Sequence, residues 1–249
     1  MLKSPLVYVV LLFVFTFFTG CNSGTEDAAA PNEAHNEGAA VNLAGQKSLK
    51  LDKTETSDAG IAKLAADNPD LVELTLGETK IQNLDEALLS LKKLKKIRVS
   101  STNLTSAGVT LLSKIETLED VDVSQTNLGD MDLMLLAQLP NLKRLNLYTT
   151  KITNFGLDFL KDFKSAGTLI WLNIDKNTLD DAAIPKLAPL TNLEWLHLGR
   201  TGLTDEGLYE LAKIKTLKEV SITNTKVSKD GVAKLQAALP NCKVNANAE

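Results

Sequence analysis

The sequence predicts an α/β fold: a right-handed solenoid with a parallel β-sheet on its concave face and helices on its convex face. Three observations predict it. A leucine-centred phrase recurs seven times along the chain. Each copy begins with the alternating apolar pattern of a strand and ends with the apolar spacing of a helix. Strands and helices that alternate in this way stack as parallel strands in sequence order, with right-handed connections.

The seven copies align on their first leucine, from which we number the positions within each copy. They read LVELTLGETKI from Leu71, LKKIRVSSTNL from Leu94, LEDVDVSQTNL from Leu118, LKRLNLYTTKI from Leu142, LIWLNIDKNTL from Leu169, LEWLHLGRTGL from Leu193 and LKEVSITNTKV from Leu217. Successive copies begin 23, 24, 24, 27, 24 and 24 residues apart. This regular period makes each copy one structural unit.

The first half of each unit predicts a short strand, because positions four and six are apolar with period two. We expect strands at Glu73–Leu76, Lys96–Val99, Asp120–Val123, Arg144–Leu147, Trp171–Ile174, Trp195–Leu198 and Glu219–Ile222. Positions four and six point into the core of the solenoid. Positions three, five and seven are therefore expected to point outward, over the concave face.

The second half of each unit predicts a helix, as the spacing of Leu208, Leu211 and Ile214 shows. Position twelve carries a residue suited to cap a helix N-terminus in five units: Thr105, Thr153, Asp180, Thr204 and Ser228. Position fifteen is small in five units: Gly108, Gly156, Ala183, Gly207 and Gly231. A small residue there would let each helix pack close to its strand, whereas Asp85 and Asp132 depart from this pattern.

Position nine is polar in every unit: Thr79, Thr102, Thr126, Thr150, Asn177, Thr201 and Thr225. We expect this side chain to bond backbone groups where strand turns into loop, because unpaired buried backbone groups are costly. With the phrase T-x-[IL]-[TS]-x-x-G-[LV], the units resemble leucine-rich repeats, in particular those of F-box-associated and related bacterial proteins. The resemblance covers about residues 46–244 and implies a right-handed leucine-rich repeat solenoid. It does not extend to an F-box, which residues 21–45 could not form.

Residues 1–20 have the layout of a secretory signal peptide. Lys3 precedes an apolar run at Pro5–Thr19, which is short for a bilayer span of ~20 residues. The following Gly20-Cys21 resembles the end of a bacterial lipoprotein signal, although Phe18 stands where that pattern prefers Leu, Val or Ile. The resemblance implies lipid modification of Cys21 and an exported protein anchored to the bacterial cell membrane or outer membrane. An ordinary signal peptide or an uncleaved anchor is the alternative.

The rest of the chain divides into two predicted parts. Residues 21–45 are rich in Ala, Asn, Glu and Gly and poor in large apolar residues, so we expect a flexible tether. Residues 46–249 form the leucine-rich repeat domain, with a capping unit at 46–70, seven repeats at 71–240 and a terminal partial unit at 241–249. Cys242 would be the remaining thiol of the mature chain, and we predict that it is a packing residue.

Composition and motifs argue against several function classes. The net charge of -4 does not favour nucleic acid as a partner. The sequence contains no G-x-S-x-G, H-E-x-x-H, phosphate-loop or calcium-loop motif. His197 is the one histidine of the repeat domain, at an outward strand position. We therefore expect a protein that is not an enzyme, with no cofactor and no metal site.

The concave face is predicted to carry an aromatic and basic patch. Trp171 and Trp195 occupy position three of adjacent units, where the other five units have a charged residue. The patch comprises Trp171, Trp195, Arg144, Tyr148, His197 and Arg200. Because Trp, Tyr and Arg are enriched at interface hot spots, we predict that it binds a protein or peptide. A cell-wall or extracellular glycan is the alternative ligand, with Asn146, Asn173 and Asp175 beside the rings, and the two rings could also merely stack on each other.

Overall fold

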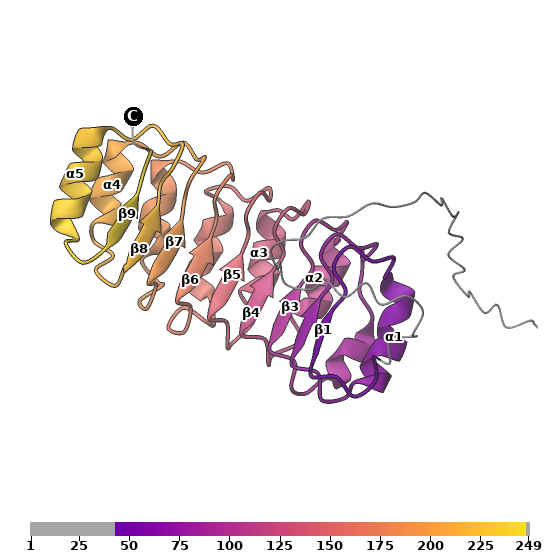
Figure 1. Ribbon diagram of the computed structural model, residues 1–249. Helices are drawn as coiled ribbons and strands as arrows, with labels where there is room; N and C mark the ends of the chain where they lie inside the picture. The colour runs from indigo at the N-terminus through magenta and orange to yellow at the C-terminus, as the bar shows by residue number, and fades with distance from the viewer. Residues whose placement is uncertain (1–42, 248–249) are drawn as a thin grey trace, which may run out of the picture. The chain divides into compact units, whose positions relative to one another are not determined.

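A computed structural model of the chain describes residues 43–247, which contain one parallel sheet of nine strands in sequence order (Figure 1). Each strand pairs with the next so that equal positions of neighbouring units lie side by side, as Trp171 does with Trp195. The strands are β1 Ser48–Lys50, β2 Glu73–Thr75, β3 Lys96–Arg98, β4 Asp120–Asp122, β5 Arg144–Asn146, β6 Trp171–Asn173, β7 Trp195–His197, β8 Glu219–Ser221 and β9 Lys243–Asn245. The predicted α/β solenoid is confirmed.

The seven predicted strands begin at the expected residues but end one residue early. The residue at position six, just after the strand, still donates its backbone N–H to the neighbouring strand. The Leu76 N–H donates to the Arg98 carbonyl at 2.8 Å, and the Leu198 N–H donates to the Ser221 carbonyl at 2.8 Å. Both leucines are buried in the core. The chain thus bends away from the sheet only after it has placed this second aliphatic residue.

The other face of the sheet is covered by helical segments, five of them α-helices (Figure 1). These are α1 Asp58–Asp67, α2 Ser106–Leu112, α3 Asp130–Leu136, α4 Asp205–Leu211 and α5 Lys229–Ala238. Three other units form 3-10 helices instead of the expected α-helices: η1 Glu86–Ser90, η2 Gly156–Asp162 and η3 Asp181–Leu187. In η3, Pro185 lacks the N–H that an α-helix needs at that point. Aliphatic side chains from the sheet and the helical layer form one continuous core.

The polar residue at position nine does what the sequence predicts. The Thr201 hydroxyl donates to the Leu198 carbonyl at 2.6 Å, and the other threonines of this position donate to the equivalent carbonyl three residues back. Asn177 donates from its amide nitrogen to the Leu147 carbonyl at 2.8 Å and accepts from the Ile152 N–H at 3.1 Å. This ladder satisfies the carbonyls at which the strands turn into loops.

Four of the five predicted helix caps are confirmed. In these units the position-twelve side chain accepts a backbone N–H at the start of the helical segment: Thr105, Asp180, Thr204 and Ser228. Thr153 does not occupy the N-cap of η2, which is Phe155 and has no side-chain cap bond, but the Thr153 hydroxyl accepts from the Phe155 N–H at 3.2 Å in the turn just before η2. Where aspartate replaces the small residue of position fifteen, it takes over the capping. Asp85 accepts from the Ala87 N–H at 2.8 Å, and Asp132 accepts from the Gly129 N–H at 2.9 Å.

The small residue at position fifteen is needed for a different reason from the one predicted. At each of the four glycines it gives room to the preceding unit, and at Gly108 and Gly207 also to a core leucine of the same unit, Leu104 or Leu203. A methyl group at Gly231 would collide with the carboxylate of Asp205 from the unit before. That carboxylate accepts from the backbone N–H of Ser228 at 2.8 Å and from its hydroxyl at 2.6 Å. Gly156 and Gly207 make room for Asp130 and Asp181 in the same way.

The predicted signal peptide, Cys21 and residues 21–42 of the predicted tether lie outside the described residues. Within residues 43–247, no helix has the length and apolar character that crossing a bilayer requires. The first backbone bond of this part joins the Gly45 N–H to the Asp67 carbonyl at 2.8 Å.

Candidate partner-binding site

Side chains at positions three and five of the strands form a surface that we call the open sheet face. Position four between them is buried in every strand from β1 to β8. The prediction that position seven also points outward is wrong for most units. Ser100, Ser124 and Asp175 are buried there, and a methyl group at Gly199 would lie 2.9 Å from the Thr223 carbonyl oxygen. The chain turns at this position, so neighbouring units crowd together.

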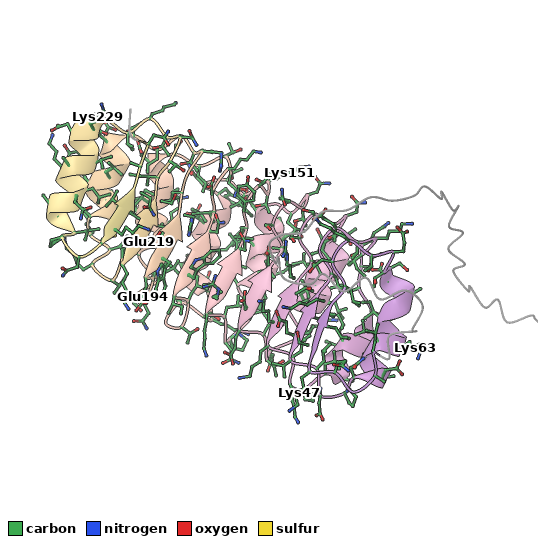
Figure 2. All side chains as sticks on the ribbon, in the orientation of Figure 1. Lys47, Lys63, Lys151, Glu194, Glu219 and Lys229 are labelled. Atoms are coloured by element: carbon green, nitrogen blue, oxygen red, sulfur yellow. The ribbon has the colours of Figure 1, made fainter. Side chains whose placement is uncertain are left out.

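A row of charges of alternating sign crosses the open sheet face at position three. Lys96 lies 3.0 Å from Glu73, and Lys243 lies 3.3 Å from Glu219. Arg144 lies 3.6 Å from Asp120 by its Nε atom. Figure 2 shows Glu219 on this face. Trp171 and Trp195 interrupt the row between Arg144 and Glu219. The two half-buried tryptophans therefore stand where paired charges would otherwise continue.

The Trp171 ring is held by two residues of the predicted patch. The guanidinium carbon of Arg144, on β5, lies 4.3 Å from its centroid. The ring of His197, on β7, has its centroid 5.4 Å away, with the two planes 50° apart. The structure thus brings Arg144, Trp171 and His197 together across three adjacent strands.

The Trp195 ring has a partner that the sequence analysis missed. The ammonium of Lys218 lies 5.4 Å from its centroid and also forms an ion pair with Glu194 at 2.8 Å. Lys218 is at position two of its unit, just before β8, and only this adjacency to position three could have indicated it. Among the described residues the two tryptophans are not ring partners of each other, although their strands are paired. Mutual stacking of the two rings is therefore not the arrangement found.

Tyr148 and Arg200 form a second group at the opposite ends of the same strands. Arg200 follows β7 and lies with its guanidinium carbon 5.8 Å from the Tyr148 ring centroid. Its Nη1 atom donates to both oxygens of buried Asp175, each at 3.1 Å. Arg200 therefore reaches back across β6, and Asp175 fixes its position. The six predicted site residues occupy three neighbouring strands and the turns that follow β5 and β7.

Burial shifts the pKa values of two groups on this face, His197 and Asp120. It lowers the pKa of His197, while Glu219 and Asp175 raise it and Arg144 lowers it further. Neutral imidazole therefore packs against Trp171 at neutral pH. Burial raises the pKa of Asp120 in spite of Arg144 and Lys96 beside it. The site thus combines an uncharged histidine with positive groups that contact aromatic rings.

Neither metal binding nor thiol chemistry is indicated in this part of the chain. Residues 43–247 contain no cluster of three or more His, Cys, Asp or Glu side chains placed to hold a metal ion. Cys242 is buried in the core beside β9, and this burial raises the pKa of its thiol. A protonated buried thiol is a poor nucleophile, in keeping with the predicted packing role.

No protein-family model and no curated protein sequence matches the chain. Solved structures do match. Internalin C2 from Listeria monocytogenes is 26% identical with a TM-score of 0.62, and the match covers 82% of this chain and 82% of that one. A leucine-rich repeat protein from Leptospira interrogans is 23% identical with a TM-score of 0.60 over 80% of this chain. The match spans 48% of the Leptospira chain. The chain therefore has the fold of leucine-rich repeat proteins.

Proposed function

We propose that this chain, with its leucine-rich repeat fold, is a scaffold that binds a protein or peptide on the open sheet face and is not an enzyme. The binding site is the patch of Trp171, Trp195, Arg144, Tyr148, His197 and Arg200. The interruption of a row of paired charges by two half-buried tryptophans carries the proposal. Large rings that face outward from a sheet leave apolar surface in water unless a partner covers them.

The patch is also held in place before any partner arrives. Arg144 and His197 fix the Trp171 ring, and Asp175 fixes Arg200. Side chains that are already ordered lose less conformational entropy on binding, so more of the contact energy becomes affinity.

A glycan ligand is less well supported by the hydrogen bonds of this face. The side-chain oxygen of Asn146 already accepts from the Tyr148 N–H at 3.1 Å, and that of Asn173 accepts from the Asp175 N–H at 3.0 Å. The carboxylate of Asp175 is held by Arg200. Part of the acceptor capacity beside the tryptophans is therefore already used within the protein, which makes it less open to sugar hydroxyls.

The experiment is a comparison of two ligand sources with the full chain and its Trp195→Ala variant. Envelope proteins captured from an extract by the chain, and lost with the variant, would support the proposal. The matched control is Glu73→Ala, which changes the same strand position in a distant unit. Binding on a glycan array that depends on Trp195, without protein capture, would instead establish the glycan alternative.

We also propose that the protein is exported and anchored to a bacterial membrane by lipid on Cys21. The support is the sequence Phe18-Thr19-Gly20-Cys21 after an apolar run, followed by residues that suit a tether. The chain should partition into the detergent phase, and Cys21→Ser should move it to the aqueous phase. Mass spectrometry that finds an unmodified N-terminus at another residue would contradict this.

A further inference from the structure

Basic residues gather at the carboxyl ends of the strands in the C-terminal half of the sheet. This basic rim, as we name it, comprises four exposed residues: Lys151, Lys176, Arg200 and Lys226. They stand at positions eight and ten of four consecutive units. In Figure 2, Lys151 lies at the edge of the sheet opposite to Lys47 and Glu194, which precede their strands. The rim therefore borders the open sheet face at the end away from the tryptophans.

In the described structure, the lysines along this edge of the sheet form ion pairs in the N-terminal half but not in the C-terminal half. In the N-terminal half, Lys53 pairs with Glu78 at 3.7 Å, and Lys80 pairs with Glu55. In the C-terminal half, Asp175 is the one acid at positions seven to eleven, and it is bound to Arg200. None of the ion pairs formed within residues 43–247 includes Lys151, Lys176 or Lys226.

Nearby aspartates at the starts of the helices are already engaged. Asp181 accepts from the N–H and hydroxyl of Thr204 at 2.8 and 2.6 Å, and Asp205 does the same with Ser228. These carboxylates are committed to contacts between units. Lys151, Lys176 and Lys226 of the basic rim thus keep positive charge that the described part of the chain does not pair.

The basic rim and the Trp195 ring are close enough for one extended peptide to reach both. Neighbouring strands lie ~4.8 Å apart, so three strand spacings from Lys151 to Lys226 span ~14 Å. Positions three and eight of one unit are five residues apart, so they are separated by at most ~16 Å at ~3.3 Å per residue. An extended segment of about six residues covers such a distance, at ~3.3 Å per residue. It could touch both Trp195 and the rim.

We propose that the partner presents an acidic segment, with carboxylates on the basic rim and an apolar side chain on the Trp195 ring. Trp195 is the receiving ring because Trp171 is already held by both Arg144 and His197, whereas within residues 43–247 Trp195 has one cation contact, with Lys218, and no ring partner. Complementary charge selects the partner and speeds its approach. This inference rests on the proposed binding function and specifies its ligand.

A first test is selection from a library of random displayed peptides on the full chain, with removal of peptides that also bind the Trp195→Ala variant. We expect the recovered peptides to be enriched in Asp and Glu around one apolar residue. Peptides that depend on Trp195 but are neutral or basic would overturn this inference and leave the proposed function standing. Recovery of no Trp195-dependent peptide would contradict the proposed function itself.

The second test measures the affinity of a synthetic peptide with the recovered consensus. Trp171 and Trp195 are the two tryptophans of the chain, so tryptophan fluorescence reports binding at the site. Replacing Lys151, Lys176 and Lys226 together by Gln should weaken binding about tenfold and reduce its salt dependence. The matched control replaces Lys53 and Lys80, the paired lysines of the same edge, by Gln and should change affinity less than about twofold. Equal affinities of the two variants would overturn the inference.

Discussion

The guanidinium carbon of Arg144 lies 4.3 Å from the centroid of the Trp171 ring, while its Nε atom lies 3.6 Å from Asp120. One side chain therefore joins the row of paired charges to the aromatic patch. The sheet register creates this junction, because β5 places Arg144 directly beside Trp171 and Asp120 on its two flanks. The junction is a property of three adjacent units and not of a single repeat.

Replacing Arg144 by Met should loosen the Trp171 ring and destabilise the fold by about 0.5–1 kcal/mol, since a partly exposed cation over a ring contributes this much. The emission of the tryptophans should move to longer wavelength as water reaches the ring. Lys243→Met is the control, because Lys243 pairs with Glu219 and contacts no ring in the described structure. Unchanged emission in Arg144→Met would show that the contact does not order the ring.

Thr201→Val should cost about 1–3 kcal/mol, because it removes the hydroxyl that donates to the Leu198 carbonyl at 2.6 Å and keeps the shape of the side chain. The free energy of unfolding in urea measures this cost. Thr225→Val is the graded comparison, since Thr225 makes the same bond at 2.7 Å but is only half-buried near the end of the solenoid. We expect the smaller loss there. Equal stability of Thr201→Val and the parent chain would show that the threonine ladder adds nothing.

Two glycines at position fifteen should respond in opposite directions to alanine. At Gly60 nothing lies within 4 Å of the added methyl group, and alanine favours a helix by up to about 1 kcal/mol, so Gly60→Ala should be more stable than the parent. At Gly231 the methyl group would collide with Asp205, and overpacking typically costs about 1–3 kcal/mol. Urea unfolding of both variants measures the difference. A stabilised Gly231→Ala would contradict the assigned contact between units.

The periodic sequence predicts the fold well for a physical reason. A period of about 24 residues aligns equal positions of neighbouring units. The pairing of Trp171 with Trp195 in the sheet therefore follows from their separation in the sequence. The side-chain contacts cannot be predicted from the repeat period. Trp171 could contact Trp195 directly or His197 diagonally, and such contacts differ by less than about 1 kcal/mol. The role of Lys218 and the burial of position seven depend on this local competition, which the pattern of one sequence does not contain.

Acid should weaken the fold through His197. Its pKa is lowered below the ordinary 6.5 because burial disfavours the imidazolium. The unfolded chain then binds the proton more readily than the folded chain, so stability falls as the pH drops from about 6.5 through the lower pKa of the folded state. His197→Gln should remove this component. Urea midpoints measured between pH 7.5 and 5 provide the comparison. Identical pH dependence of the variant and the parent would rule out the contribution of His197.

Alanine variants of the two tryptophans should differ in their effects on the stability of the fold and on partner binding. Trp171 is held by Arg144 and His197, so Trp171→Ala removes two ring contacts and should destabilise the fold by about 1–2 kcal/mol. Among the described residues Trp195 has one cation contact, with Lys218, and no ring partner, so Trp195→Ala should cost less than about 1 kcal/mol in stability. If Trp195 is a hot spot, its loss should weaken partner binding by about 2 kcal/mol or more, close to thirtyfold in Kd. Urea unfolding and a binding titration of the same two variants measure both quantities. A stability loss in Trp195→Ala with binding intact would mean that the ring serves the sheet and not the partner.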